Sequence, residues 1–253
     1  MKFDLRLDDK VAIITGGAMG LGKGIAAGLA SLGARVVIAD VNESIGGQTL
    51  DEIIAEGNKA EFYTVDVTND DHFQKMVEEI VTKYKRIDIL VNNAGIATKS
   101  NCVDMQVADW RRIIDVNLTG SWIGSRAVAP VMIKQRSGKI INMCSMFGFT
   151  AMPGLSAYAA SKGGINQLTK ALSLELIEHN INVNAVAPAY IATEISANMR
   201  NDKERYEDIM RRTPIHRLGT IEEIVGPVVF LASDLSNFMV GHTMLVDGGW
   251  NAW

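Results

Sequence analysis

Residues 11–22 read VAIITGGAMGLG. The first five of them, Val11–Thr15, form a continuous run of strand-forming residues, and a helical pattern of small residues follows over Leu21–Leu32. Glycines at 16, 20 and 22 permit a tight turn that brings the backbone close to a ligand, and the start of a helix supplies free N–H groups and a positive dipole end. This order of strand, glycine-rich turn and helix predicts the first unit of an α/β fold that holds a phosphate-bearing ligand.

The alternation of strand and helix continues along the rest of the chain. Further strands are predicted at Arg35–Ala39, Ala60–Val65, Ile87–Val91, Lys139–Met143, Asn182–Ala187 and Thr243–Val246, and further helices at Ser44–Glu56, Asp70–Tyr84, Val107–Lys134, Tyr158–His179 and Ile221–Ser233. The strands are continuous apolar runs, as expected for a parallel sheet with helices on both faces. Because no repeat, linker or composition shift interrupts the pattern, we predict one domain over residues 1–253: an α/β, Rossmann-type doubly wound parallel sheet.

Composition and charge exclude several classes of protein. The 253 residues carry 25 basic and 29 acidic side chains, a formal net charge of −4, and lack the basic face that nucleic acid requires. No apolar run approaches the roughly 18 residues of a membrane span, and the first ten residues lack the apolar core of a signal peptide. The two cysteines, Cys102 and Cys144, form no C-x-x-C pair, and the histidines lack metal-ligand spacing. We predict a cytoplasmic protein with no nucleic-acid, membrane or metal partner.

The residues after the glycine-rich turn indicate which cofactor it holds. The strict G-x-G-x-x-G pattern fails, because Ile25 stands where its third glycine would be. Asp40, however, ends the second predicted strand 18 residues after Gly22, close to the roughly 20 expected for an acid that binds ribose hydroxyls. A carboxylate there repels a 2′-phosphate, and Val41 and Met19 are uncharged, which favours NAD over NADP. The alternative is that Asp40 is a solvated acid at a strand end.

A phenol and an ammonium form the candidate catalytic pair. Tyr158 and Lys162 lie four residues apart on a predicted helix, so both belong to one helix face. Ser145 follows the predicted strand Lys139–Met143, and Asn117 lies within the long helical region. A phenol with a pKa near 10 is a poor base at neutral pH, whereas a nearby ammonium lowers that pKa. Spacing alone does not show that the two groups meet, and such a pair is often two exposed surface residues without a catalytic role.

Together, the motifs resemble those of the short-chain dehydrogenase/reductase family, in the family's order along nearly the whole chain. The matching segments are Thr15-Gly16…Gly20-Leu21-Gly22, Asp66-Val67, Asn92-Asn93-Ala94-Gly95, Asn117, Ser145, Tyr158…Lys162, Pro188 to Thr193 and Val246-Asp247-Gly248-Gly249. The resemblance implies an enzyme that transfers a hydride between a secondary alcohol and a nicotinamide cofactor. It also implies a homotetramer, and a substrate lid at about residues 189–219.

The resemblance assigns roles to individual residues. Tyr158 is the expected general acid/base, Lys162 lowers its pKa and binds the nicotinamide ribose, Ser145 orients the substrate oxygen, and Asn117 holds a water of a proton relay. The residues expected to bind the cofactor are Gly16, Met19, Gly20, Leu21, Gly22, Asp40, Asp66, Val67, Asn93, Ala94, Gly95, Tyr158, Lys162, Pro188, Ile191 and Thr193. One departure is Ala189, which stands where the family usually has a glycine.

The substrate is the least determined part of the prediction. The segment Ile140–Met146 and the tail Val246–Trp250 resemble the sugar-acid and polyol branch of carbohydrate metabolism, with gluconate 5-dehydrogenases and 2-dehydro-3-deoxygluconate 5-dehydrogenases. That branch often carries paired basic residues after the Asn-Asn-Ala-Gly motif, where this chain has Lys99 alone. The alternatives are a 3-oxoacyl-carrier-protein reductase, which Asp40 disfavours, and a non-catalytic dinucleotide sensor, which has no need of the four catalytic residues.

Overall fold

A computed structural model describes residues 4–193 and 202–252. Seven strands form one sheet in the order β3-β2-β1-β4-β5-β6-β7, and all neighbouring strands are parallel. The strands are β1 Val11–Thr15, β2 Arg35–Asp40, β3 Lys59–Thr64, β4 Ile89–Asn92, β5 Gly138–Met143, β6 Ile181–Pro188 and β7 Thr243–Val246. The predicted fold class is confirmed.

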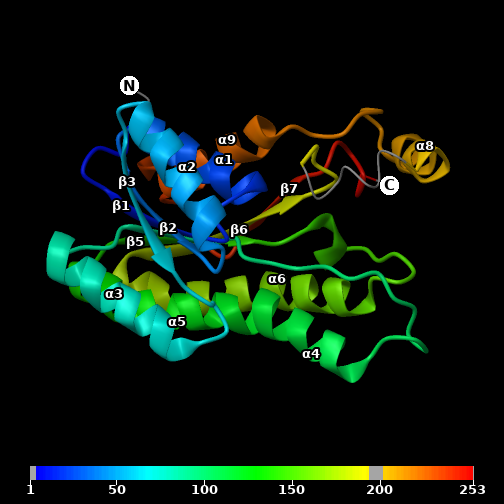
Figure 1. The fold of residues 1–253 in the computed structure, drawn as a ribbon, viewed down its shortest axis with the longest axis horizontal. Coiled ribbons are helices and arrows are strands. Elements are labelled where there is room, and N and C mark those ends of the chain that lie inside the picture. The colour runs from blue at the N-terminus through cyan, green and yellow to red at the C-terminus, as the bar shows by residue number, and fades with distance from the viewer. Residues whose placement is uncertain (1–3, 194–201, 253) are drawn as a thin grey trace.

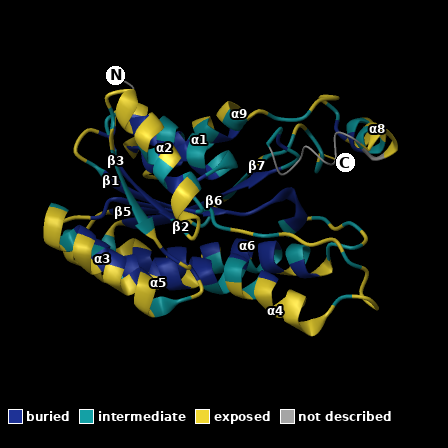
Figure 2. Cartoon of the chain, viewed as in Figure 1, coloured by how far each residue is buried: buried dark blue, intermediate teal, exposed yellow. Residues whose placement is uncertain are grey.

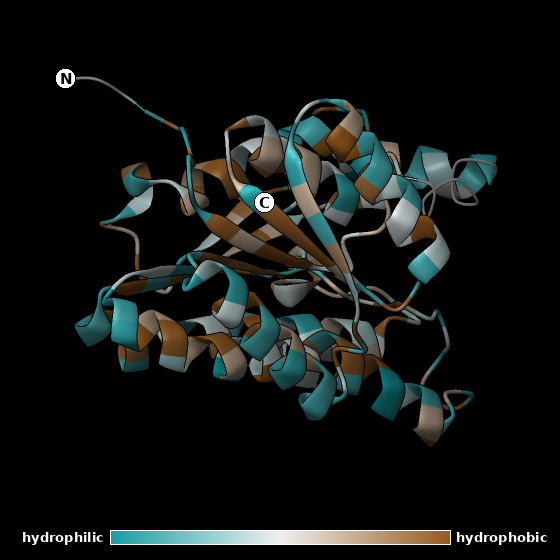
Figure 3. Ribbon diagram, turned by 60° about the vertical axis from the view of Figure 1, so that its left-hand side comes forward, coloured by the Kyte–Doolittle hydropathy of each residue, from teal (hydrophilic) through white to brown (hydrophobic). Residues whose placement is uncertain are grey.

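Helices cover both faces of the sheet (Figure 1). On one face lie α1 Gly20–Ser31, α2 Glu43–Ala55 and α9 Ile221–Ala232, and on the other α3 Asp70–Tyr84, α4 Val107–Ile114, α5 Gly120–Gln135 and α6 Ser156–Leu176. The five central strands β1, β2, β4, β5 and β6 are largely buried between these layers (Figure 2) and mostly apolar (Figure 3), whereas the edge strands β3 and β7 are only partly buried. Double coverage therefore explains why the strand sequences do not alternate between apolar and polar residues.

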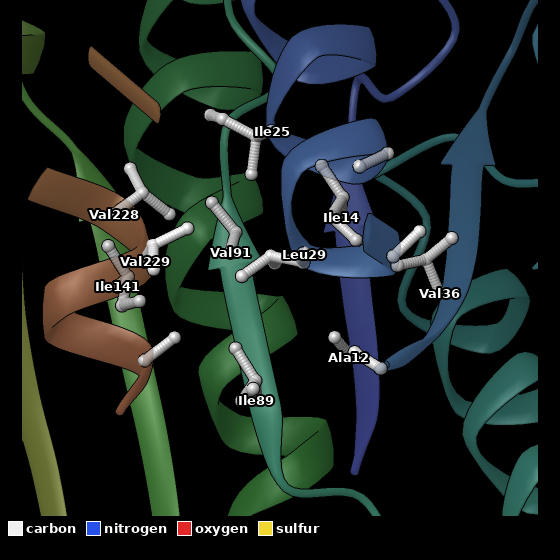
Figure 4. Packing of buried hydrophobic residues seen from close by; sticks show 14 of the residues in the cluster. Ala12, Ile14, Ile25, Leu29, Val36, Ile89, Val91, Ile141, Val228 and Val229 are labelled. Atoms are coloured by element: carbon white, nitrogen blue, oxygen red, sulfur yellow. The ribbon is translucent and has the colours of Figure 1, made fainter. Parts of the chain in front are cut away.

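Each helical layer builds its own core against the sheet. On one face, Leu29 of α1 packs on Ile14 of β1 and Val91 of β4, with Val228 of α9 in the same cluster (Figure 4). On the other face, Phe73 of α3 is completely buried in a second cluster. These two cores hold the strands in register, so that their carboxyl ends meet along one edge of the sheet.

Two regions differ from the sequence prediction. The helix predicted over Val107–Lys134 is divided by a π-helical turn, Asp115–Thr119, between α4 and α5. Apolar periodicity does not reveal such a widened turn, which commonly marks a functional segment. The chain also forms α8, Lys203–Arg212, within the charged segment predicted as a lid. Residues 194–201 of that predicted lid lie outside the described residues.

Candidate active site

One cavity of about 1440 Å³ opens at the carboxyl ends of the strands. Seventeen of the predicted site residues line it: Gly16, Met19, Gly20, Leu21, Gly22, Asp40, Asp66, Val67, Asn93, Ala94, Gly95, Ser145, Tyr158, Lys162, Pro188, Ile191 and Thr193. Asn117 is the exception, since it is completely buried behind the wall. The topology thus brings together residues that are far apart in the sequence.

The glycine-rich turn is packed too closely for side chains at two positions and is open at a third. A Cβ on Gly22 would lie 2.0 Å from the carbonyl oxygen of Gly16, and Gly16 itself has a φ of +62°. Gly20 also has a left-handed φ, +56°, yet a Cβ there would meet nothing within 4 Å. The turn therefore leaves open space beside Gly20 at the start of α1, where backbone N–H groups attract an anion.

The end of β4 secures this turn. The amide Nδ2 of Asn93 donates to the carbonyl oxygens of Thr15 and Gly16, both at 3.0 Å. The hydroxyl oxygen of Thr15 in turn accepts from the backbone N–H groups of Asn93, at 3.0 Å, and Ala94, at 3.1 Å. Sequence reasoning assigned no role to the Thr15 hydroxyl, although its place between strand and turn was a usable signal.

Asp40 is more than a solvated acid. Its Oδ2 accepts from the backbone N–H of Ala18 at 3.1 Å, and its Oδ1 accepts from that of Asn42 at 3.0 Å. Ala18 is also held by the Thr49 hydroxyl, which donates to its carbonyl oxygen at 2.7 Å. The carboxylate therefore ties the end of β2 to the glycine-rich turn while it lines the cavity.

Tyr158, in the first turn of α6, faces Ser145, which follows β5. Burial raises the pKa of the Tyr158 phenol, and its hydrogen bond with the Ser145 hydroxyl acts to lower that pKa. The Ser145 oxygen also accepts from the backbone N–H of Phe147 at 3.2 Å. The phenol and the hydroxyl thus lie together beside the open part of the cavity, as a substrate oxygen would require.

Lys162 lies one helical turn beyond Tyr158 and is only 5% exposed. Its Nζ donates to the carbonyl oxygen of Met143 at 2.7 Å and lies 5.7 Å from the centroid of the Tyr158 ring. Burial lowers the pKa of Lys162 to about 8. The ammonium thus lies over the Tyr158 ring, while its hydrogen bond goes to the end of β5.

Asn117 lies at the centre of the π-helical turn and joins three segments. Its Oδ1 accepts from the backbone N–H of Ile96 at 2.8 Å, and its Nδ2 donates to the carbonyl oxygen of Ile96 and to the hydroxyl of Ser161, both at 3.0 Å. Because Ser161 precedes Lys162 on α6, these bonds connect the loop after β4 to the helix that carries Tyr158 and Lys162. The amide supports the site from behind, and its predicted role in a proton relay stays a prediction.

Two residues beside the site have ordinary structural roles. Cys144 is buried, burial raises the pKa of its thiol, and its Sγ lies 3.2 Å from the carbonyl oxygen of Lys162. Ala189 is not among the described non-glycine residues with positive φ, and its N–H donates to Val246 at 3.2 Å. No left-handed backbone is therefore required at position 189, so alanine fits where the family usually has glycine.

The described residues also bear on other kinds of site. Within them, no group of three His, Cys, Asp or Glu side chains is placed to hold a metal ion. In the same part of the chain, no helix has the length and apolar composition needed to cross a bilayer. The cavity at the carboxyl ends of the strands is the candidate site because the predicted residues meet there.

Comparison with known proteins places the fold and the cavity in context. A family model described as enoyl-(acyl carrier protein) reductase matches residues 16–251. The chain is 39% identical over 247 residues to cyclopentanol dehydrogenase of Comamonas sp. (98% of this chain, 99% of the relative). It is 41% identical over 249 residues to 3-oxoacyl-(acyl-carrier-protein) reductase of Thermotoga maritima (97% and 99%) and 38% identical over 247 residues to 2-dehydro-3-deoxy-D-gluconate 5-dehydrogenase of Dickeya dadantii (97% of each chain).

A solved structure extends the likeness to three dimensions. The gluconate 5-dehydrogenase of Burkholderia cenocepacia, in complex with NADP and tartrate, superposes with a TM-score of 0.95 at 36% identity and covers 99% of this chain and 98% of its own. The similar proteins therefore share one fold and one broad chemistry, while their names differ in substrate.

Proposed function

The chain belongs to the short-chain dehydrogenase/reductase family of oxidoreductases, which use a nicotinamide dinucleotide, and from that premise we propose that it interconverts a secondary alcohol and a ketone with NAD(H). The observation that carries this proposal is the convergence of Tyr158, Ser145 and Lys162 on a cavity whose other end holds the glycine-rich turn and Asp40. A dinucleotide sensor would need only the half of this cavity that holds the glycine-rich turn and Asp40.

The residues along the cavity fit a dinucleotide. The open space at Gly20 suits the pyrophosphate, and the carboxylate of Asp40 suits the ribose hydroxyls of the adenosine half. Asp66 and Val67 line the cavity and would hold the adenine end, and Pro188, Ile191 and Thr193 line it and would hold the nicotinamide end. The remaining proposed contacts come from the turn and the end of β4: Gly16, Met19, Leu21, Gly22, Asn93, Ala94 and Gly95.

The proposed reaction divides between a hydride and a proton. The nicotinamide supplies a hydride acceptor in alcohol oxidation and a hydride donor in ketone reduction. Tyr158 takes the hydroxyl proton as phenolate in oxidation and returns it as phenol in reduction, while Ser145 holds the substrate oxygen. The Lys162 ammonium stabilises the phenolate through its field, which opposes the effect of burial on the pKa of Tyr158. Asn117 supports Lys162 through Ser161.

NAD(H) is the proposed cofactor rather than NADP(H). Asp40 places a carboxylate in the cavity wall, and its neighbour Val41 is uncharged. A 2′-phosphate would therefore approach a negative charge, and Val41 supplies no cation to balance that charge. The gluconate 5-dehydrogenase of Burkholderia cenocepacia was solved with NADP, so this preference has to be measured on the present chain.

A sugar acid or a polyol is the proposed substrate. The side chain of Lys99 lies along Gly154: a Cβ added to Gly154 would be 2.9 Å from the Cγ of Lys99 and 3.3 Å from its Cε. Gly154 precedes Leu155, which lines the cavity. Lys99 is therefore an exposed cation near the cavity wall without lining the cavity itself, and its ammonium would attract a carboxylate that approaches from this side. A 3-oxoacyl thioester is the second candidate, since a relative that this chain matches over 99% of its length is named a 3-oxoacyl-(acyl-carrier-protein) reductase.

A substrate panel tests the proposal. Sugar acids, polyols, simple cyclic and aliphatic secondary alcohols and a 3-oxoacyl thioester are assayed by NADH absorbance, on the parent protein and on Lys99→Met. If a sugar acid is the substrate, Lys99→Met raises its KM and leaves the KM for a neutral polyol unchanged. Turnover of the thioester alone would refute the sugar-acid assignment, and binding of NADH without turnover of any alcohol or ketone would support the sensor.

We further propose that the whole chain, residues 1–253, acts as one domain and assembles as a cytoplasmic homotetramer. Apolar side chains exposed on this single chain support assembly, with Phe238, Val240 and Leu245 around the edge strand β7 and Trp110 and Trp122 on α4 and α5. Sedimentation equilibrium gives the mass of the assembly, and a monomer at micromolar concentration would refute the tetramer.

A further inference from the structure

A row of aromatic rings runs from the C-terminal tail to the catalytic phenol. The ring of Trp250 meets Tyr190 edge to face at 5.6 Å between centroids, Tyr190 meets Phe147 at 6.1 Å, and Phe147 meets Tyr158 at 6.4 Å. The interplanar angles, from 70° to 83°, are those in which aromatic pairs attract each other. Four rings from distant parts of the sequence are thus in continuous contact.

The second ring of the row belongs to the wall of the cavity. Tyr190 lines the cavity next to Ala189, and its carbonyl oxygen accepts from the N–H of Gly219 at 3.0 Å. Its hydroxyl lies 3.7 Å from the sulfur of Met152. The backbone and the hydroxyl of Tyr190 therefore have defined contacts, and its ring packs against those of both Phe147 and Trp250.

The third ring connects this wall to the reacting groups. Phe147 is 6% exposed, and its N–H donates to the hydroxyl oxygen of Ser145 at 3.2 Å. Its ring packs against Tyr158, so a shift of Phe147 would move both the hydroxyl and the phenol that hold the substrate oxygen. Proton transfer depends steeply on such positions.

Hydrogen bonds and close packing hold the tail that carries Trp250. The carboxylate of Asp247 accepts from the N–H of Gly249 at 3.0 Å, and from the N–H and Nδ2 of Asn251, both at 2.9 Å. Gly249 has a φ of +88°, and a Cβ there would lie 2.9 Å from the Cγ of Pro214. The tail is thus packed against the segment that follows α8, which leaves the ring of Trp250 a defined place beside Tyr190.

We propose that Trp250 is a positioning residue for the reaction. It acts through Tyr190 and Phe147 to keep Ser145 and Tyr158 in place and to set the wall of the substrate half of the cavity. This inference rests on the proposed oxidoreductase function. The effect is on the chemical step and the substrate, because the row does not reach the glycine-rich turn or Asp40.

The kinetic test compares Trp250→Leu with Trp250→Phe, and with Tyr84→Leu, a control at the end of α3 whose ring contacts Arg35. The best substrate of the panel supplies kcat and KM, and NADH fluorescence supplies the cofactor Kd. We expect Trp250→Leu to lower kcat about 2- to 12-fold, the size that one edge-to-face contact supports, with the NADH Kd unchanged. Trp250→Phe keeps a ring and should recover most of the loss, and Tyr84→Leu should behave as the parent.

Three outcomes would overturn the proposal. Trp250→Leu retains the kcat of the parent, or Trp250→Phe is as impaired as Trp250→Leu, or the NADH Kd rises by the same factor as kcat falls. The last would show that the tail supports the fold or the cofactor site generally. Far-UV circular dichroism and the melting temperature confirm that each variant is folded.

A second measurement needs no turnover, so it separates this proposal from the proposed function. Near-UV circular dichroism of Trp250→Phe identifies the band of Trp250, and Tyr190→Leu should change that band because the two rings touch. If the parent turns over no alcohol or ketone, the proposed function fails while this coupling is still measured. If Tyr190→Leu leaves the Trp250 band unchanged, the proposed coupling between the rings of Trp250 and Tyr190 is refuted.

Discussion

Replacing Asp40 by asparagine tests the cofactor preference with the smallest change in shape. Each carboxylate oxygen of Asp40 accepts one backbone N–H, from Ala18 and from Asn42. Asparagine keeps one acceptor oxygen and removes the negative charge. We expect NADPH to gain affinity and NADH to lose some, because the repulsion of a 2′-phosphate disappears and the bonds to the ribose hydroxyls weaken.

The size of the effect follows from the charge and its surroundings. Two unit charges about 4 Å apart repel by about 1 kcal/mol in water and about 4 kcal/mol at an effective dielectric constant of 20, and half-buried Asp40 lies between these limits. Removing the charge should therefore narrow the NAD(H) preference by about 5- to 700-fold. Asp40→Ala should in addition weaken both cofactors, because the N–H groups of Ala18 and Asn42 lose their acceptor.

Isothermal titration with NADH and NADPH on the parent, Asp40→Asn and Asp40→Ala decides the matter. Asp109→Asn is the matched control, since Asp109 is an exposed acid in the first turn of α4 that does not line the cavity. The reasoning is refuted if the parent binds NADPH more tightly than NADH, or if Asp40→Asn leaves the ratio of the two dissociation constants unchanged.

Three further changes test the catalytic residues and the buried charges. Tyr158→Phe should lower kcat by at least about 10²–10⁴-fold and leave the NADH Kd in place, since the ring remains and the proton is lost; more than about a tenth of the parent rate, in a steady-state assay, would assign the proton to another residue. Lys162→Met should move the oxidation limb of the kcat–pH profile to higher pH, because the charge that stabilises the phenolate is removed; a limb that stays in place contradicts this. Burial lowers the pKa of Lys139 to about 8, so the unfolded chain binds the proton of this ammonium more tightly than the folded chain does. The free energy of unfolding should therefore rise between about pH 8 and 10.5, and this group contributes at most about 3 kcal/mol to the rise. Urea unfolding of Lys139→Met should show a smaller rise, and an equal rise would exclude Lys139 as a source.

The order of strands and helices was readable from the sequence because it depends on local periodicity. Val11–Thr15, Asp70–Tyr84 and Thr243–Val246 have the predicted bounds in the structure. The π-helical turn at Asp115–Thr119 was not predicted, because its widened hydrogen bonding leaves the apolar pattern of the helix intact. Local signals thus determined which elements form, and they missed a change of pitch inside a helix.

The candidate site was only partly open to sequence reasoning. The spacing of Tyr158 and Lys162 predicted a shared helix face, and the rule that ligands bind at the carboxyl ends of parallel strands predicted where the other motifs meet. The rings of Phe147, Tyr190 and Trp250 were not connected, because no periodicity relates residues so far apart. Tyr190 nevertheless stood inside a motif whose neighbours were named, which was the available signal.

The sequence by itself determined the fold class and the family motifs and predicted the reacting groups, because each depends on residue type and short spacing. Only the tertiary structure decided which group each side chain contacts. It directed the Lys162 ammonium to the carbonyl oxygen of Met143 and the Asp40 carboxylate to the N–H of Ala18. The physical reason is that these contacts arise from the packing of helices on the sheet, in which every strand contributes to one edge and no single segment specifies its partners.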